Sequence, residues 1–577
     1  MTTQLSYQAK HTLALAILLA PALAMAQAQT LPDAGRILES NRPPALIAPP
    51  KPGVKVLPDA APLAPVAPSG EQRVTVTGFV LQGVSALPED QLQAVLKPWT
   101  GRDLSFADLN QAAAEVSRYY RARGFFLASA YLPAQDLAGG MVRLQVLEGR
   151  LSSISMAPDA SVRLDPGVAR RYLDALLPAG AALHEERLER AILLTQDLPG
   201  VSARADLGPG ARIGESALGI ALSEGPLVSG SAGLDNTSNR YTGRVRATGG
   251  VNLNDPGGSG AQLALQGAST GSDFNYARIG AVLPVGARGT RVGLSYSGMR
   301  YHLGADFEAL NARGDARVAQ LLAVHPLLRS RYASVQLRAA LEDKRYANRA
   351  NGVETSDKTV QTLPLGVSAS RQDQWYGGGV SSASLEIMPG RVDLGGNAAS
   401  QALDAGGARS EGSFVRTAYQ IARLQRIGQN ASLSASLSGQ FASKNLEAGE
   451  KMSLGGSDRV RAYASGEASG DEGHVLALEM RYELGRWNSD VSAFYDIGQV
   501  KLNRKPYQGA LVSGGPGNSY DLQGVGLGCR WRAPAGVSVQ LQVATKLGNN
   551  PARSADGRDA DGRSGRTRAW LQVATYF

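Results

Sequence analysis

An alternation of apolar and polar residues through the second part of the chain, residues 225–577, constrains the fold most. Residues 431–441 read Ala-Ser-Leu-Ser-Ala-Ser-Leu-Ser-Gly-Gln-Phe, and residues 537–546 alternate in the same way. Successive side chains of a strand point to opposite faces, so this pattern predicts strands with one apolar and one polar face. At about 9 to 11 residues per membrane strand plus turns, about 350 residues suit on the order of sixteen strands.

A soluble sandwich buries its apolar face, whereas a membrane barrel turns that face to lipid, and alternation alone does not separate the two. The last strand, 569–577, alternates up to a terminal aromatic residue. A barrel that ends there places Tyr576 and Phe577 in its interfacial aromatic girdle. We expect a mainly β fold, a sixteen-stranded transmembrane β-barrel over residues 225–577, in the outer membrane of a Gram-negative bacterium.

The first residues fit this location. Lys10 precedes an apolar stretch, 13–25, and small-x-small cleavage sites follow, so residues 1–28 read as a secretory signal peptide. No later run approaches the roughly 20 apolar residues of a transmembrane helix, so a membrane crossing would use strands. An even number of strands puts both ends of the barrel in the periplasm.

Four segments lie between the signal peptide and the barrel. A short helix is expected within residues 29–42, at 33–40, and a linker rich in proline within 43–71. Residues 72–149 and 150–224 each show strands and two helices and end in Glu-Gly, so they predict two tandem α+β domains in the periplasm. The clearest helices are 89–96, one opened by a capping box at Ser105 and Asp108, 166–177 and 185–197; the clearest strands there are 73–80, 125–131, 141–147, 203–207 and 217–222.

Composition argues against an enzyme. The single Cys529 excludes a disulfide and a structural zinc site, and it alternates onto the lipid face of its strand. The five histidines are dispersed, and no nucleophile order or phosphate-binding loop is recognisable, so we expect no catalytic residues, no metal and no cofactor. The net charge of +9 is scattered along the chain, so no nucleic acid is expected as a partner.

One loop stands out, at residues 454–473 between two predicted strands. It contains Val460, Arg461, Ala462 and Tyr463. Loops of this length without secondary structure are uncommon unless they are functional or disordered. We therefore expect the loop to fold back inside the barrel.

A following strand, 490–500, supplies a partner for Arg461. Its alternation turns Phe494, Asp496 and Gly498 into the lumen, where Gly498 leaves space for packing. An ion pair between Arg461 and Asp496 is the prediction. Spacing alone leaves other possibilities open, namely that Arg461 meets the inward-facing Glu479 or Glu483, or that it is solvated.

These runs resemble the two-partner secretion transporters, the TpsB or FhaC-like family of haemolysin activators. The usual loop motif there is Val-Arg-Gly-Tyr, and its Arg meets the Asp of a Phe-x-Asp-x-Gly strand motif inside the barrel. Ala462 replaces the Gly here, while Arg461, Tyr463 and Asp496 match directly. The two α+β units resemble the family's periplasmic POTRA domains, through 119–125 and 132–136 in the first and 197–201 in the second, and the short helix corresponds to the family's plug helix.

The resemblance implies a transporter of type V (two-partner) secretion. The POTRA domains would capture the N-terminal secretion domain of one TpsA-like exoprotein, and the barrel would pass it outward. Further partners would be the lipid bilayer and, through the C-terminal strand, the barrel assembly machinery. An outer-membrane protein assembly factor is the alternative, and a porin would have no reason for the two periplasmic units. The identity of the exported protein is not encoded in this chain.

Overall fold

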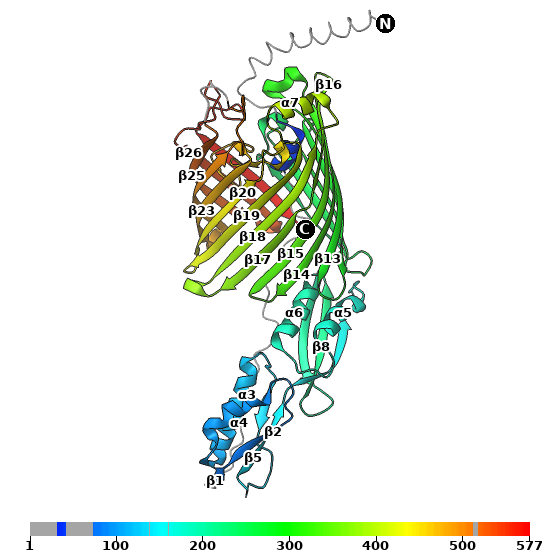
Figure 1. The fold of residues 1–577 in the computed structure, drawn as a ribbon, viewed down its shortest axis with the longest axis vertical. Coiled ribbons are helices and arrows are strands. Elements are labelled where there is room, and N and C mark those ends of the chain that lie inside the picture. The colour runs from blue at the N-terminus through cyan, green and yellow to red at the C-terminus, as the bar shows by residue number, and fades with distance from the viewer. Residues whose placement is uncertain (1–31, 42–72, 138, 160, 512–516, 555) are drawn as a thin grey trace, which may run out of the picture.

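The computed structural model describes residues 32–41, 73–137, 139–159, 161–511, 517–554 and 556–577. Two small α+β units follow one another below a barrel, and the helix α2 (Ala34–Ser40) lies inside the barrel (Figure 1). The expected signal peptide, 1–28, and the linker, 43–71, lie outside the described residues. Below, the lower rim is the barrel end beside the α+β units, and the upper rim is the opposite end.

The barrel is closed and antiparallel throughout, and its sixteen strands confirm the predicted architecture. In chain order its segments are β9 (Val228–Asp235), β10 (Arg246–Asn254), β11 (Gln262–Ser269), β12 (Phe274–Val285), β13 (Thr290–His302), β14 (Arg313–Arg329), β15 (Ala333–Ala350), β16 (Val353–Thr362), β17 (Leu365–Asp373), β18 (Gly379–Asp393), β19 (Gly412–Ile427), β20 (Ala431–Ala442), β23 (Glu472–Leu484), β24 (Ser489–Lys501), β25 (Ser519–Arg532), β26 (Val537–Leu547) and β27 (Thr567–Tyr576). The segments β16 and β17 form one strand, because both pair with β15 on one side and with β18 on the other. The interruption falls at Pro364, which has no N–H to donate to a ladder.

The barrel closes where the last strand meets the first. Ladder pairs run from Gln572 and Asp235 to Tyr576 and Ser231. Beyond them Gly230 N donates to Phe577 O at 2.8 Å and Phe577 N to Gly230 O at 3.1 Å. The Phe577 ring lies over Gly230, because a Cβ on that glycine would come within 2.6 Å of the ring. Tyr576 and Phe577 thus end the chain, exposed, at the lower rim.

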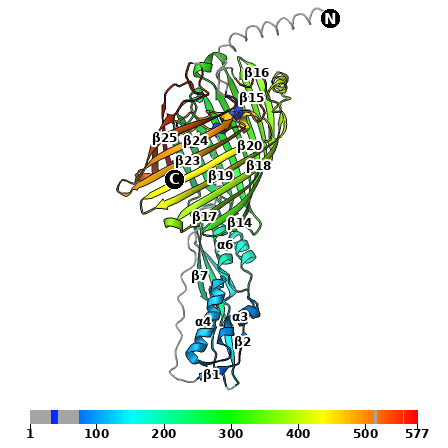
Figure 2. The ribbon, with the colours of Figure 1, turned by 60° about the vertical axis from the view of Figure 1, so that its left-hand side comes forward.

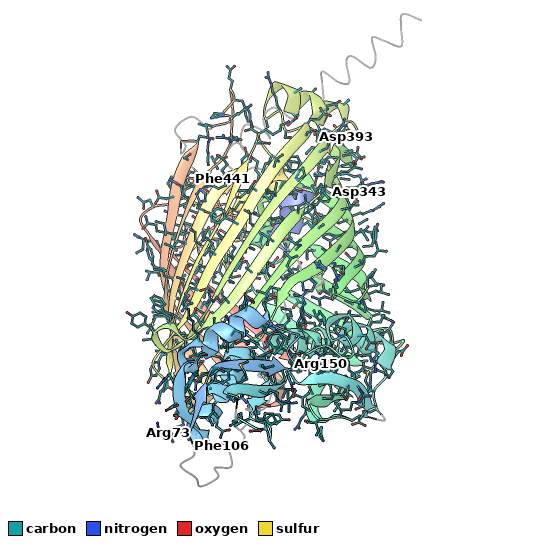
Figure 3. All side chains as sticks on the ribbon, turned by 60° about the horizontal axis from the view of Figure 1, so that its bottom comes forward. Arg73, Phe106, Arg150, Asp343, Asp393 and Phe441 are labelled. Atoms are coloured by element: carbon teal, nitrogen blue, oxygen red, sulfur yellow. The ribbon has the colours of Figure 1, made fainter. Side chains whose placement is uncertain are left out.

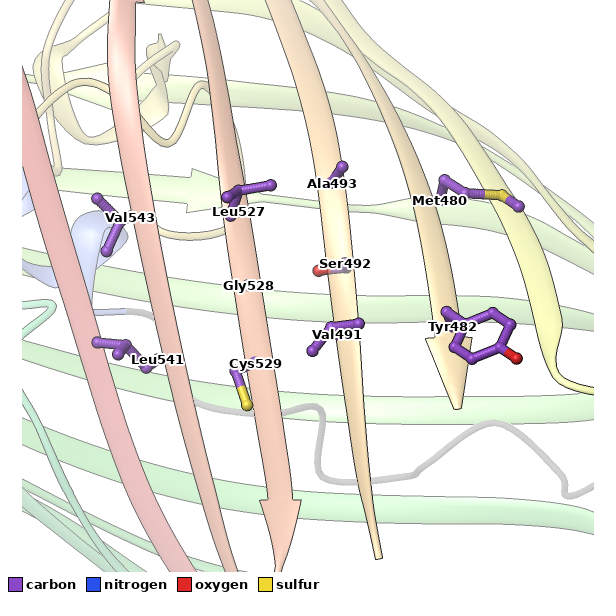
Figure 4. Close-up of a pocket in the computed structure, with 10 residues that line it drawn as sticks. All are labelled: Met480, Tyr482, Val491, Ser492, Ala493, Leu527, Gly528, Cys529, Leu541 and Val543. Carbon is purple, nitrogen blue, oxygen red and sulfur yellow. The ribbon is translucent and has the colours of Figure 1, made fainter. Parts of the chain in front are cut away.

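Many outward-facing side chains of the barrel are large and apolar. On β23 to β26 they line a shallow groove in the outer wall with room of about 550 Å³, shown in Figure 4. Exposed Met480, Leu527 and Val543 flank the small residue Ala493 there, and Cys529 lies in the next row, between Val491 and Leu541. The predicted outward position of the cysteine is therefore present in the structure.

The first α+β unit contains β1 (Arg73–Val76), β2 (Gly78–Gln82), α3 (Glu89–Leu96), a 3₁₀ turn η1 (Lys97–Trp99), β3 (Arg102–Ser105), α4 (Phe106–Ala122), β4 (Ser129–Tyr131) and β5 (Met141–Leu147). The predicted capping box opens α4: Ser105 Oγ accepts from Asp108 N at 3.2 Å and Asp108 Oδ2 accepts from Ser105 N at 2.8 Å. The stripe from Leu109 to Tyr120 packs on the sheet β2-β5-β4.

Two expectations for this unit need correction. The expected strand 125–131 is reduced to Ser129–Tyr131, because Gly124 adopts a positive φ of 88° and Ala128 N bonds back to Phe125 O, which makes a turn of its first half. The expected strand 73–80 is two strands in different sheets, one of which pairs with β3, a strand that the sequence pattern did not indicate.

The second unit contains β6 (Arg150–Pro158), α5 (Pro166–Leu176), α6 (Glu185–Gln196), β7 (Val201–Pro209) and β8 (Glu215–Glu224). Its sheet has the order β6-β8-β7, with β6 parallel and β7 antiparallel to β8. Figure 3 places Arg150 at the junction of the two units below the barrel. None of the described helices is long and apolar enough to cross a membrane.

The second unit is fastened to the lower rim. Asp197, which follows α6, accepts two hydrogen bonds from Arg329 at the end of β14, both 2.9 Å long. Arg331 in the adjoining turn forms ion pairs with Glu185 and Glu189 of α6. Partly buried, charge-assisted bonds of this kind fix the geometry of the joint.

Candidate functional site

The loop between β20 and β23 folds back into the barrel. Its ends form a two-stranded ladder, β21 (Met452–Ser453) with β22 (Ser469–Gly470). Between them Leu454, Val460, Ala462 and Tyr463 are buried against the inward faces of β23 to β26. The loop fills part of the lumen, as the sequence predicted.

Arg461 is the polar anchor of this loop. Its Nε and Nη2 donate to the two oxygens of Asp496 at 2.9 and 2.7 Å, and its backbone N donates to Asp496 Oδ2 at 3.0 Å. The remaining Nη1 donates to Glu479 at 2.5 Å. Of the partners that spacing left open, Asp496 and Glu479 both bind Arg461, and no contact with Glu483 is present. The arginine is 6% exposed and the aspartate 0% exposed, so the pair is shielded from water.

An aromatic ring and a glycine of β24 complete the contacts that hold the loop. The guanidinium carbon of Arg461 lies 3.4 Å from the centre of the Phe494 ring, a favourable cation–π position. A Cβ on Gly498 would lie 3.1 Å from side-chain atoms of Leu454 and Val460, so this glycine admits the loop.

Ala462 does not need the backbone freedom of the glycine usual in the motif. Its φ is not positive, so an L-residue fits there without strain. Its methyl group faces Gly524 of β25, where an added Cβ would lie 2.6 Å from that of Ala462.

Tyr463 and the loop backbone are held from β26 and β27. The Tyr463 ring is fully buried, with Lys546 Nζ 5.2 Å from its centre. Trp570 Nε1 of β27 donates to Arg461 O at 2.8 Å. Neither Trp570 nor Gly524 was singled out from sequence. The sequence does carry a signal for Gly524: Gly524, Gly526 and Gly528 occupy one face of β25, which therefore has no side chains at these positions.

The helix α2 occupies the lumen beside this loop, as both ribbon views show (Figures 1 and 2). Asp33 caps the helix by accepting from Arg36 N at 2.9 Å. Ala34 and Ile37 are buried against aromatic and aliphatic residues of the barrel wall. An isolated helix of seven residues would not persist in water, so these contacts stabilise it.

Polar contacts tie α2 to the wall and to the loop. Lys358 of β16 binds Asp33 at 2.6 Å and also pairs with Glu447. Asn348 Oδ1 of β15 accepts from Ala34 N at 2.9 Å. Gly35 touches Gly449 of the 3₁₀ turn η5 (Ala448–Glu450), where a Cβ on either glycine would be 2.9 Å from the other's Cα.

Arg36 extends this contact into the loop, because its Nη2 donates to Gly466 O. The helix and the loop are therefore in direct contact and share the lumen. No group of three or more His, Cys, Asp or Glu residues in the described part of the chain is arranged to hold a metal ion.

Comparison with known proteins places this barrel in a family of secretion proteins. Residues 214–530 match the family described as haemolysin secretion/activation protein ShlB/FhaC/HecB, and residues 74–149 match the POTRA domain of ShlB type. The chain belongs to the haemolysin secretion/activation family. It is thus a two-partner secretion transporter of the outer membrane, with its POTRA end, and hence the lower rim, on the periplasmic side.

Individual relatives agree. The chain is 28% identical to the heme/hemopexin transporter protein HuxB of Haemophilus influenzae over 80% of this chain and 81% of that protein. It is 26% identical to the outer membrane transporter CdiB of Escherichia coli over 71% and 69%, and 25% identical to the hemolysin transporter protein ShlB of Serratia marcescens over 79% and 81%. The solved structure of CdiB from Escherichia coli shares the fold, with a TM-score of 0.69, 21% identity and coverage of 90% of this chain and 93% of that one.

Proposed function

We propose that this chain exports one large exoprotein through its barrel, after its two periplasmic units have captured the exoprotein's N-terminal secretion domain. The family and the attached POTRA domain support this function. We treat the second unit as a further POTRA domain because its order of strands and helices repeats that of the first. As a transporter, the chain needs no catalytic group of its own.

Capture would use an exposed sheet edge. In the second unit β7 pairs with β8 and with no other strand among the described residues, so its second edge can accept an extended peptide. Addition of a strand at such an edge gives affinity through main-chain hydrogen bonds and specificity through alternate side chains. An unfolded exoprotein offers many such segments.

The observation that carries the proposal is the double occupancy of the lumen. Both α2 and the loop 454–473 are held by side-chain contacts rather than by continuous ladders, so each can be displaced without opening the wall. We infer that α2 closes the pore at rest and that Arg461, through Asp496 and Glu479, keeps the loop in its working position.

Deletion of residues 33–40 should therefore raise the ion conductance of the barrel in planar bilayers. A deletion of equal length in the linker, 58–65, is the matched control and should leave conductance low. Equal conductance of the two deletion variants would contradict a closing role of α2.

Deletion of residues 73–224 separates the candidate functions in cells. An exporter loses its exoprotein from the culture medium while the levels of other barrel proteins stay constant. Deletion of the periplasmic units of an assembly factor would instead lower those levels.

We further propose that β27, with Tyr576 and Phe577, is the segment that the barrel assembly machinery recognises during insertion into the bilayer.

A further inference from the structure

A small cavity at the upper rim is surrounded by arginines. It has a volume of about 200 Å³ and lies between the loop that joins β9 to β10, the loop that joins β26 to β27, and the start of β27. Arg240 and Arg244 come from the first loop, Arg563 from the second, and Arg568 from β27. The cavity lies above the seam that closes the barrel. Ala464 and Ser465 of the loop 454–473 and Trp570, which donates to Arg461 O, also line it.

The carboxylates nearby do not neutralise this cluster. Asp306 binds Arg240 at 2.6 Å, and Asp561 binds Arg568 at 2.8 Å. Asp559 lies 3.9 Å from Arg568 and also pairs with Lys546 and Arg553. Arg563 Nε lies 3.9 Å from the same Asp561, at the limit of an ion pair. Arg244 is exposed, and among the described residues no carboxylate forms an ion pair with it.

The pKa of Arg563 reflects the same excess of positive charge. Burial lowers the pKa of its guanidinium; Asp561 acts to raise it, but Arg244, Arg568 and Arg240 lower it further. Like charges that repel one another around a cavity are stabilised when an anion enters. In addition, the buried Nε of Arg568 has no hydrogen-bond acceptor among the described residues.

We propose that this cavity is a binding site for a phosphoryl group. Guanidinium groups bind phosphate with paired, charge-assisted hydrogen bonds, and arginines from three segments can address several oxygens of one phosphoryl group. The site has room for a compact anion in place of ordered water.

The position of the cavity favours a lipid as the source of that group. Val245 lines the cavity and is 61% exposed on the barrel, so an apolar surface adjoins the arginines. The upper rim is opposite the POTRA end and thus lies at the outer leaflet. A headgroup that bears phosphate would meet the arginines while its acyl chains follow the outer wall. Free phosphate would offer the same chemistry without this apolar contact.

The test uses the full chain in detergent, with the double variant Arg244→Gln and Arg563→Gln. The matched control, Arg300→Gln with Arg313→Gln, removes two exposed arginines from the same rim, at the upper ends of β13 and β14. Each protein is titrated with a diphosphorylated glycolipid in mixed micelles, with the same glycolipid after removal of its phosphates, and with inorganic phosphate. The readout is an apparent Kd from the rise in Tm.

Wild type and the control variant should bind the phosphorylated glycolipid equally well. The cavity variant should bind at least about tenfold more weakly, since each lost bond is charge-assisted. Equal affinity of the cavity variant, or equal binding of the dephosphorylated lipid, would overturn the proposal. Binding of inorganic phosphate alone, with the same dependence on the arginines, would keep the phosphoryl site and reject the lipid source. The single variant Arg244→Gln, at an exposed loop position, gives the same comparison if the double variant does not fold.

Discussion

Arg461 binds two acidic residues, and this determines how its substitutions should behave. Removal of one partner from a buried ion pair costs about 3 to 5 kcal/mol, and less in a wet lumen. Asp496 accepts three hydrogen bonds from Arg461 and Glu479 accepts one. We therefore expect Asp496→Asn to impair secretion more than Glu479→Gln.

The charge reversal Arg461→Asp with Asp496→Arg should restore only part of the secretion lost by either single change, because the new aspartate would face Glu479. Secretion of the exoprotein and proteolysis of the loop are the two measurements. Asp458→Asn, at an exposed position of the same loop, is the control. Equal secretion by all variants would show that the ion pair has no role in transport.

Ala462 and Gly524 make a size-complementary pair that can be tested by exchange. Gly524→Ala would put two Cβ atoms 2.6 Å apart, which the packed wall cannot absorb without a shift. Overpacking of this kind costs about 1 to 3 kcal/mol. The second change Ala462→Gly should relieve the contact, so the exchanged pair should regain thermal stability that Gly524→Ala alone loses.

The control for this exchange is Gly298→Ala in β13, where an added Cβ meets no atom within 4 Å. If Gly298→Ala and Gly524→Ala lower Tm to the same extent, the loss reflects the strand and not the loop.

The sequence was sufficient for residues whose direction follows from strand alternation, and insufficient for residues whose partners are set by the tertiary packing. Arg461 and Asp496 could be paired because strand alternation gives the direction of Asp496 and resemblance supplies its partner. Gly524 and Trp570 could not be assigned, because their role depends on which strands lie opposite the loop after closure. Lys358 and Glu447 were missed for the same reason, since they meet α2 only in three dimensions.

At the scale of elements, Glu148, which directly follows β5, links this strand to the turn after β2 and to the helix α4. Its buried carboxylate accepts from Ser85 N at 2.6 Å, Ala86 N at 2.7 Å and Tyr120 Oη at 3.0 Å, and it pairs with Arg150 at 3.1 Å. Burial alone would raise its pKa, but the hydrogen bonds from Ala86 and Ser85 outweigh burial, and the pKa is lowered. Because the folded-state pKa is below the unfolded value of about 4.3, Glu148 stabilises the unit above that pH and ceases to do so as pH falls through the folded pKa.

We therefore expect Glu148→Gln to increase hydrogen exchange in α4 and β5 at neutral pH and to reduce the loss of protection that wild type shows below about pH 4. Glu115→Gln, on the exposed side of α4, is the control. If the two variants give the same pH profile, Glu148 does not account for the acid sensitivity of this unit.

Elements with strong local patterns were predicted well. The strand Val537–Leu547 and the helix Glu89–Leu96 have the predicted bounds, because each has a clear period and clear ends. The strand Arg102–Ser105 escaped prediction, since four residues carry no period and it exists through its pairing with β1. The position of α2 inside the barrel could not be predicted from the local sequence either, because it depends on contacts with distant strands.

For the whole molecule, the joint between α6 and the lower rim should set the angle of the periplasmic units. Arg329→Ala with Arg331→Ala removes the two rim arginines that bind the second unit, while Arg190 of α6 keeps its hydrogen bonds to Pro326 O and Leu327 O. The distance between spin labels on the first unit and on the barrel should then spread over a broader range while the barrel stays folded. Arg170→Ala, whose arginine bonds within α5, is the control. An unchanged distance distribution would show that the other contacts suffice.

The two carboxylates around Lys358 bear on how reversible the closed pore can be. With α2 in place, one ammonium group faces two carboxylates, Asp33 and Glu447. When the helix departs, Asp33 leaves with it, and Lys358 and Glu447 remain as a balanced pair. The wall is thus not left with a stranded charge, and the docked state is the one with an unbalanced anion. A pore built in this way can exchange its occupant repeatedly, because Lys358 keeps Glu447 as its counterion when the helix leaves.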